Sequence, residues 1–152
     1  MLIGVRHTGL VVANLGSSVK FFEALGFKVV SREVESGLVV STIVGIADVR
    51  ICIAKLRAPD GSMIELLQYL SHPDLSGPFS QSSNRLGCSH IALSVRSIED
   101  TCKVILKFGG SLVNPPIETA DGSFRVAYCH SPDGLLIEVV QQMRAEHNGE
   151  AD

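Results

Sequence analysis

The sequence lacks the short signatures by which many binding sites are recognised. Neither glycine-rich pattern that holds phosphates, G-x-x-x-x-G-K or G-x-G-x-x-G, occurs in it. The four cysteines (Cys52, Cys88, Cys102 and Cys129) show no Cys-x-x-Cys spacing and no zinc-finger spacing. They are therefore interpreted as small buried side chains of a protein in a reducing cytoplasm.

Clustered positive charge and long apolar runs are missing too. Thirteen Lys and Arg residues are scattered along a chain of net charge −3, so no basic face is offered to nucleic acid. The N-terminus "MLIGVRHTGLVV" lacks the basic segment and long apolar core of a signal peptide. The most apolar stretch, Leu38 to Leu56, is interrupted by Asp48, Arg50 and Lys55. We interpret it as two strands of a sheet, and we expect neither a membrane nor nucleic acid as a partner.

What the chain does contain is one module present twice. The segment His7–Val30, "HTGLVVANLGSSVKFFEALGFKVV", aligns without a gap with His90–Val113, "HIALSVRSIEDTCKVILKFGGSLV". A second pair of segments follows, because "PDGSMIELLQ" (Pro59–Gln68) matches "PDGLLIEVVQ" (Pro132–Gln141). Duplication is the simplest account of these matches, and a repeat of this kind determines the expected fold.

Each copy is expected to form a strand, a helix and three further strands. Asn14 or Ser97 is placed to cap the helix, which should end at Gly26 or Gly109. The last strand is introduced by a Pro-Asp-Gly turn. One copy alone buries too little apolar surface to be stable, so the two must pack together. The predicted class is therefore α+β, with two tandem βαβββ modules.

The expected organisation is a single domain followed by a polar tail. The linker between the two modules contains proline, glycine and serine, and the tail after the second module is polar. The expected ranges are a domain over 1–142, a first module over 5–69, a linker over 70–87, a second module over 88–142 and a tail over 143–152.

Strand alternation singles out one glutamate in each copy. In "SMIELLQYL", Glu65 shares its face of the strand with apolar neighbours, and in "LLIEVVQ", Glu138 does the same. A buried and unpaired carboxylate costs roughly several kcal/mol. Each glutamate therefore needs a cation, a metal ion or solvent in a cleft beside it.

A histidine recurs together with each glutamate. His7 and His90 are both embedded in strand-forming sequence, where a lone histidine would be a structural residue. Their recurrence at the same place in both copies predicts that His7, Glu65, His90 and Glu138 converge on one divalent metal ion. Imidazole and carboxylate ligands suit Ni²⁺, Co²⁺, Zn²⁺, Mn²⁺ and Fe²⁺.

The paired modules, with these four residues at the recurring ligand places, resemble the vicinal oxygen chelate superfamily. That group includes glyoxalase I, methylmalonyl-CoA epimerase, extradiol dioxygenases, and bleomycin- and fosfomycin-resistance proteins. The resemblance covers roughly Val5 to Gln142. It implies a curved, mainly antiparallel half-barrel sheet around a central cleft that holds the ion. It also implies a cytoplasmic homodimer, whose modules pair within one chain or are swapped between two.

The number of ligands narrows the reaction. Four protein ligands leave two positions on an octahedral ion, which suit a substrate that chelates through two neighbouring oxygens, as an enolate does. This favours an isomerase or epimerase of the glyoxalase type, in which Glu138, or Glu65 by pseudosymmetry, takes a proton next to the carbonyl of a small α-carbonyl or thioester substrate. The alternatives are an extradiol dioxygenase, which needs three open positions, and a non-catalytic protein that sequesters a small molecule.

The resemblance also bears on the substrate. In glyoxalase I, an Arg four residues after the first His and an Asn four residues after the first Glu both serve to bind glutathione. In this sequence, Val11 stands at the first of these positions and Tyr69 at the second. A glutathione hemithioacetal is therefore not the expected substrate.

Candidate substrate-binding residues are Tyr69, Arg50 and Arg125, although a solvated or salt-bridged role is the alternative for both arginines. The segment "VRICIA" resembles "FRVAYC", which sets Arg50 opposite Arg125. The remaining histidines are interpreted as ordinary surface residues: His72, His130 and His147.

Overall fold

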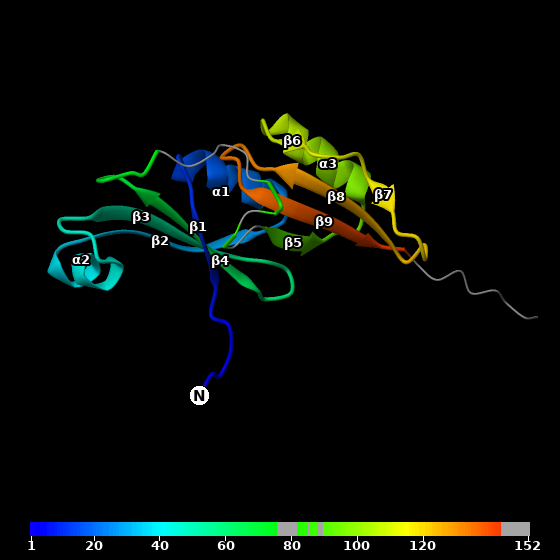
Figure 1. Ribbon diagram of the computed structural model, residues 1–152. Coiled ribbons are helices and arrows are strands. Elements are labelled where there is room, and N and C mark those ends of the chain that lie inside the picture. The colour runs from blue at the N-terminus through cyan, green and yellow to red at the C-terminus, as the bar shows by residue number, and fades with distance from the viewer. Residues whose placement is uncertain (76–81, 85, 88–89, 144–152) are drawn as a thin grey trace, which may run out of the picture. The chain divides into compact units, whose positions relative to one another are not determined.

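The computed structural model describes residues 1–75, 82–84, 86–87 and 90–143. The chain divides into two compact units, Met1–Gly77 and Pro78–Asp152. Each unit holds one sheet with a ten-residue helix packed on it (Figure 1). The predicted α+β class is confirmed. Cys88, His147 and most of the predicted tail lie outside the described residues.

The first unit contains a four-stranded sheet in the order β1-β4-β3-β2. β1 pairs with β4 in parallel, and the other two pairings are antiparallel. Helix α1 packs against β2, β3 and β4, where Phe22 and Leu66 are fully buried. The elements are β1 (Thr8–Val11), α1 (Leu15–Ala24), β2 (Lys28–Ser36), α2 (Leu38–Val44), β3 (Arg50–Arg57) and β4 (Met63–Tyr69).

The second unit repeats this arrangement with one change. Its strand order is β5-β9-β8-β6, and β7 also pairs with β8. The short strands β6 and β7 together take the place of β2, because Pro115 and Pro116 lie between them and proline interrupts a ladder of hydrogen bonds. The elements are β5 (Ile91–Ser94), α3 (Ile98–Lys107), β6 (Ser111–Leu112), β7 (Ile117–Glu118), β8 (Phe124–His130) and β9 (Leu136–Gln142).

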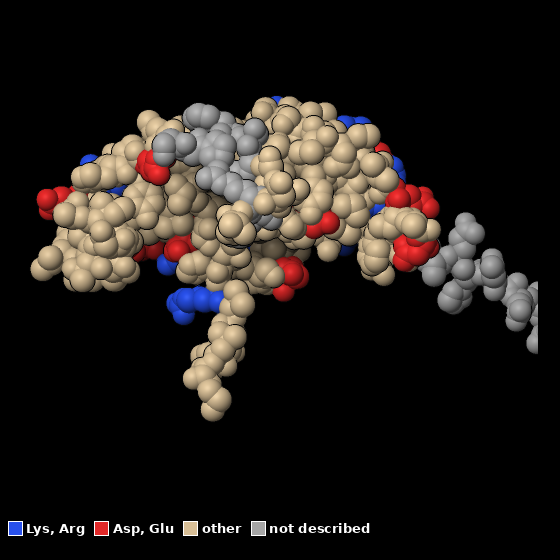
Figure 2. Space-filling view, in the orientation of Figure 1, with Lys and Arg blue, Asp and Glu red and all other residues tan. Residues whose placement is uncertain are grey.

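Helix α2 corrects one prediction. Two strands are predicted over Leu38 to Leu56, but only the second exists, as β3, and the first apolar run is the helix α2. Gly37 precedes α2 with a φ of 97°, and Gly45 follows it with a φ of 72°. Gly45 has the left-handed conformation that ends helices. Val40 is buried in a cluster with Ile51, so tertiary packing overrides the strand preference of the β-branched residues. The visible surface of α2 carries no charged side chain (Figure 2).

Both long helices begin with the predicted caps. Asn14 Oδ1 accepts a hydrogen bond from the Ser17 N–H at 2.9 Å, and Ser97 Oγ accepts one from the Asp100 N–H at 3.2 Å. These caps bind N–H groups that have no partner within the helix itself.

A glutamine on the last strand of each unit ties that strand to its helix. Gln68 Oε1 accepts a hydrogen bond from the Leu15 N–H at 2.9 Å. Gln141 Oε1 accepts one from the Ile98 N–H at 2.8 Å. Since each glutamine lies three residues after its candidate glutamate, the contact anchors the strand that carries the candidate site.

Replacing Gln141 by Ala should lower the free energy of unfolding by about 1–2 kcal/mol, because the N–H of the buried residue Ile98 loses its partner. Urea denaturation measures the effect. The exposed neighbour provides the control, since Gln142→Ala should change stability by less than about 0.5 kcal/mol. Equal losses in the two variants would contradict an anchoring role for Gln141.

Two of the cysteines lie in the core of the second unit. Cys102 on α3 and Cys129 on β8 are buried, as the sequence predicts, whereas Cys52 on β3 is only half-buried, and none of these three forms a disulfide. Burial raises the pKa of the Cys129 thiol to about 12, and it also raises the pKa of Cys102. Both thiols therefore stay protonated at neutral pH.

None of the helices in the described ranges is long and apolar enough to cross a membrane.

Candidate active site

The recurring histidine and glutamate of the first unit lie side by side. Glu65 is on β4, and the parallel pairing with β1 sets Gly9 opposite it. His7 precedes Gly9 by two residues and therefore points to the same side of the sheet. His7 Nε2 lies 2.9 Å from Glu65 Oε2, and only 13% of the Glu65 side chain is exposed.

The second unit reproduces this geometry. The parallel pairing of β5 with β9 sets Ala92 opposite Glu138, and His90 lies two residues before Ala92. His90 Nε2 lies 3.2 Å from Glu138 Oε2, and 23% of the Glu138 side chain is exposed. The structure therefore brings together one predicted His–Glu pair in each unit.

Beside the glutamate, the two units differ. The residue opposite Glu65 on β3 is Lys55, whose Nζ lies 3.7 Å from Glu65 Oε1 and 3.2 Å from Glu33 Oε1 on β2. The hydrogen bond to Glu33, and then the charge of Glu33, raise the pKa of Lys55, so the ammonium stays charged. Lys55 is one cation that compensates Glu65, and sequence reasoning did not single it out.

In the second unit, the same position is taken by Tyr128, which lies opposite Glu138 on β8. Tyr128 Oη lies 3.4 Å from His90 Nε2, and the two rings meet edge to face with centroids 5.2 Å apart. Burial, and then the charge of Glu138, raise the pKa of the phenol. Tyr128 is therefore a neutral hydrogen-bonding group beside the His–Glu pair.

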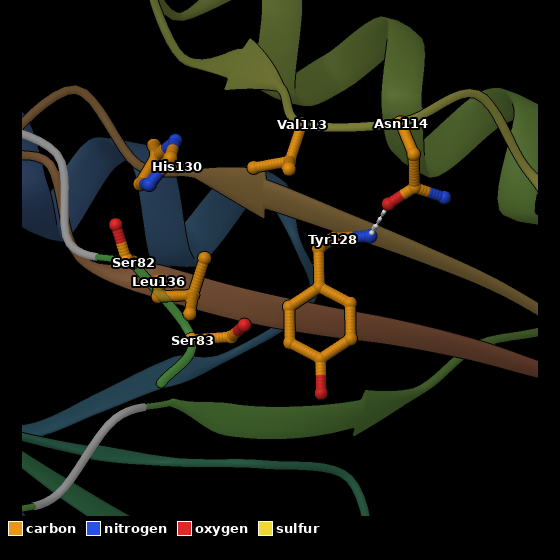
Figure 3. Close-up of a pocket in the computed structure, with 7 residues that line it drawn as sticks. All are labelled: Ser82, Ser83, Val113, Asn114, Tyr128, His130 and Leu136. Atoms are coloured by element: carbon orange, nitrogen blue, oxygen red, sulfur yellow. Dashed lines mark hydrogen bonds between the residues drawn. The ribbon is translucent and has the colours of Figure 1, made fainter. Parts of the chain in front are cut away.

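A pocket of about 320 Å³ opens beside Tyr128 (Figure 3). The Tyr128 ring bounds one side of it, and the Ser83 hydroxyl points toward that ring. Asn114 holds the wall, because its Oδ1 accepts from the Tyr128 N–H at 2.9 Å and its Nδ2 donates to the Pro115 carbonyl at 2.8 Å. The lining carries no charged group of Asp, Glu, Lys or Arg, and consists of Ser82, Ser83, Val113, Asn114, Tyr128, His130 and Leu136.

His130 corrects a second prediction. Sequence reasoning interprets it as an ordinary surface histidine in a loop, but it is the last residue of β8, half-buried, and lines this pocket. It follows Tyr128 by two residues and therefore lies on the same side of the strand. The Tyr-x-His spacing directly before the second Pro-Asp-Gly turn could have indicated this position.

The arginines proposed to bind substrate lie away from the His–Glu pairs. Arg125 points to the helix side of its sheet, where its Nη1 contacts Glu99 Oε1 of α3. The strand registers set Cys52, not Arg50, at the position equivalent to Arg125, because Cys52 pairs with Gln68 and Arg125 with Gln141. Arg50 is exposed at the start of β3.

Tyr69, the third residue proposed to bind substrate, is the last residue of β4. It packs against a buried apolar cluster that α2, β3 and the residue before β3 form together. The members of this cluster are Val40, Val49, Ile51 and Ile53. A role for Tyr69, Arg50 or Arg125 in binding a substrate stays a prediction.

Known proteins share both the sequence pattern and the fold. The family model of the glyoxalase/bleomycin resistance protein/dioxygenase superfamily matches residues 4–139. A probable lactoylglutathione lyase of Vibrio parahaemolyticus is 28% identical over 93% of this chain and 92% of its own length. The crystal structure of a glyoxalase family protein from Bacillus cereus is 26% identical, with a TM-score of 0.88 over 95% of this chain and 97% of that one.

A more distant match shows the fold alone. A variant of the genomically encoded fosfomycin resistance protein of Listeria monocytogenes, solved with Mn(II) and a dihydroxypropylphosphonic acid, is 17% identical. Its TM-score is 0.59, over 91% of this chain and 90% of that chain. Since the family model spans most of the sequence, this chain belongs to the glyoxalase/bleomycin resistance protein/dioxygenase superfamily.

Proposed function

We propose that this protein is a metal-dependent isomerase or epimerase of the glyoxalase type that acts on a small α-carbonyl compound. One observation carries the proposal, namely that each unit presents an imidazole nitrogen within 3.2 Å of a carboxylate oxygen at equivalent places of its sheet. The relatives named as lactoylglutathione lyases support it.

The donor set fits a divalent ion. Two imidazole nitrogens and two carboxylate oxygens form a borderline-to-hard set that suits Ni²⁺, Co²⁺, Zn²⁺, Mn²⁺ or Fe²⁺. We propose that His7, Glu65, His90 and Glu138 together hold one such ion. When bound, it would polarise the carbonyl of the substrate.

The carboxylates of the chain would carry the proton. Glu138 or Glu65 takes the proton from the carbon next to the carbonyl, and the electron pair of that C–H bond moves toward the carbonyl oxygen to give an enolate. If the same carboxylate then returns the proton to the neighbouring carbon, the product is an isomer. If the other carboxylate instead delivers a proton to the opposite face of the same carbon, the product is an epimer. A positioned base of this kind contributes about 10²- to 10⁴-fold to the rate.

We expect protein purified without chelator to bind one divalent ion per chain, because the two His–Glu pairs share it. Calorimetric titration with Ni²⁺ and with Mn²⁺ measures this ratio. His7→Ala and His90→Ala should each weaken binding by more than about 10-fold, since even outer partners of metal ligands are worth about 10- to 100-fold. His72→Ala, at an exposed position, is the control. A ratio of two ions per chain would show that each pair works alone.

Proton exchange tests the reaction itself. S-lactoylglutathione, methylmalonyl-CoA and hydroxyacetone would each be incubated with the metal-loaded protein in D₂O and followed by proton NMR. Loss of the α-proton signal from any of them supports the proposal. Consumption of O₂ with a catechol would instead indicate a dioxygenase. Binding of a probe without exchange or O₂ consumption would indicate a protein that sequesters small molecules.

A further inference from the structure

Two exposed basic residues, Lys28 and Arg57, stand directly opposite each other on the face of the first sheet that carries Glu65. Lys28 of β2 pairs with Arg57 of β3, and Arg57 pairs in turn with Met63 of β4. Arg57 follows Lys55 by two residues, so its side chain leaves β3 on the side where Lys55 contacts Glu65. Lys28 shares this side, because residues paired across two strands point to the same face of a sheet.

Neither member of this basic pair has an anionic partner in the part of the chain that the structure describes. No ion pair there includes Lys28 or Arg57. By contrast, Lys55 lies two residues away on the same strand and pairs with Glu33 at 3.2 Å. Like charges directly opposite each other destabilise a sheet, so the basic pair lowers stability unless an anion binds to it.

The carboxylates beside the basic pair already have partners. Glu65 lies diagonally across from it, and its two oxygens face His7 at 2.9 Å and Lys55 at 3.7 Å. Asp60, in the turn after β3, accepts hydrogen bonds from the Ser62 N–H at 2.9 Å and from the Ser62 hydroxyl at 2.8 Å. Neither carboxylate therefore neutralises the basic pair, which favours an anion from a bound molecule.

The second unit shows that the fold does not require two cations at this place. The equivalent residues are Ser111 of β6 and His130 of β8, which pair with each other. His130 pairs with Leu136 just as Arg57 pairs with Met63. Two permanent positive charges are thus a property of the first unit and not of the repeated module, which favours a role in binding over a role in folding.

We propose that Lys28 and Arg57 bind an anionic group of the substrate, a carboxylate or a phosphate, while its carbonyl reacts beside His7 and Glu65. This inference rests on the proposed function and narrows the substrate to a compact α-carbonyl compound that carries an oxyanion. The planar guanidinium of Arg57 presents a fork of N–H donors that matches two oxygens of either group. The ammonium of Lys28 adds a second positive charge.

The spacing of the strands sets the length of such a substrate. His7 lies beside Met63, because Gly9, two positions after His7, lies opposite Glu65. Met63 therefore separates His7 from Arg57 across the sheet. Since neighbouring strands are about 4.8 Å apart, the backbones of His7 and Arg57 lie about 10 Å apart. An arginine side chain covers much of this distance, so we expect the oxyanion only a few bonds from the reacting carbon.

The first test measures anion binding and needs no reaction. Inorganic phosphate and succinate would each be titrated into the full-length, Zn²⁺-loaded protein and followed by the amide NMR signals of β2 and β3. The probe that binds more tightly identifies the group as a phosphate or a carboxylate. Arg57→Gln should weaken its binding by about 10-fold, the usual effect of losing a hydrogen bond between charged groups. Arg57→Lys, which keeps the charge but not the fork, should weaken it by about 3-fold.

Arg32→Gln provides the matched control for the loss of charge. Arg32 is also exposed on β2, but it pairs with Ala54 and so lies on the opposite face of the sheet. Its replacement should change the affinity for either anion by less than about 2-fold, because salt screens distant surface charges. Circular dichroism verifies that each variant is folded. Equal affinities in the wild type and in Arg57→Gln would overturn the proposal.

The second test compares substrates that differ only in the anionic group. Dihydroxyacetone phosphate would be compared with dihydroxyacetone, and levulinate with 2-pentanone, in the α-proton exchange assay. For the group that the first test identifies, the wild type should favour the anionic compound by at least about 10-fold in kcat/KM, mainly through KM. Arg57→Gln should lose this preference, whereas Arg32→Gln should keep it. A purely structural role of Arg57 would change both rates alike, and an unchanged preference would overturn the proposal.

The two proposals can fail separately. If the wild type exchanges no compound while Arg57→Gln still weakens anion binding, the proposed reaction is wrong and the anion site at Arg57 is supported. If the wild type exchanges the anionic and the neutral compound of a pair equally well, the reaction is supported and the role of Arg57 toward the substrate is wrong.

Discussion

Replacing Glu138 by Gln should lower the rate of α-proton exchange by about 10²- to 10⁴-fold, the usual contribution of a positioned general base. The amide has the size of the carboxylate and keeps one oxygen that can face His90, but it cannot accept the proton of the substrate. The decrease should appear in kcat, because the lost interaction is made only in the transition state. NMR in D₂O and steady-state kinetics measure both quantities.

Metal content decides how a decrease is interpreted. Glu138→Gln should be compared with the wild type at equal occupancy by Ni²⁺, since the same residue is a proposed ligand. Glu118→Gln changes an exposed glutamate on β7 and should exchange at the rate of the wild type. A metal-loaded Glu138→Gln protein that exchanges as fast as Glu118→Gln would remove Glu138 from the mechanism.

Replacing Phe22 by Ala should lower the free energy of unfolding by about 3–5 kcal/mol. Phe22 on α1 is fully buried and meets two other rings edge to face, Phe21 with centroids 5.2 Å apart and Phe27 with centroids 5.5 Å apart. Truncation leaves a cavity and also removes two aromatic contacts. α1 packs on β4, the strand that carries Glu65.

Urea denaturation followed by circular dichroism measures the loss. Phe124→Ala provides the matched control, because the Phe124 side chain is 38% exposed, and its truncation should cost less than about 1 kcal/mol. Similar losses in the two variants would show that the rings around Phe22 do not form the main core of the first unit.

The repeat made the His–Glu pairs predictable from sequence. Each histidine stands just before a first strand, and each glutamate stands at the same distance after a Pro-Asp-Gly turn. Parallel pairing of the first and last strands then brings the two side chains together in each unit. The helix caps at Asn14 and Ser97 were predictable for a similar reason, since a cap depends on contacts within a few residues.

Features that depend on strand register were harder to predict. The similarity of "VRICIA" to "FRVAYC" suggests an alignment two residues away from the one that the sheets adopt. Counting back from the two Pro-Asp-Gly turns sets Lys55 and Tyr128 at equivalent places, four residues before Pro59 and Pro132. In a closed hairpin, the number of residues between the turn and a strand position sets the residue with which that position pairs. Local similarity between two apolar strands does not set this register.

Helix α2 illustrates a second limit. Its sequence, "LVVSTIV", consists mainly of residues that favour strands, and its short length gives no helical period to detect. Its conformation follows from Gly45 at its end and from the burial of Val40 against β3, and the second of these is known only once the sheet is in place.

The protonated core thiols have a consequence for an enzyme of this proposed class. Reactive α-carbonyl compounds are electrophiles, and the thiolate is the form of cysteine that such reagents alkylate. Cys129, with a pKa of about 12, and Cys102, whose pKa is also raised, present neither the charge nor the access that this attack requires. A reactive carbonyl compound bound at the proposed site would therefore not alkylate these two buried cysteines of the second unit.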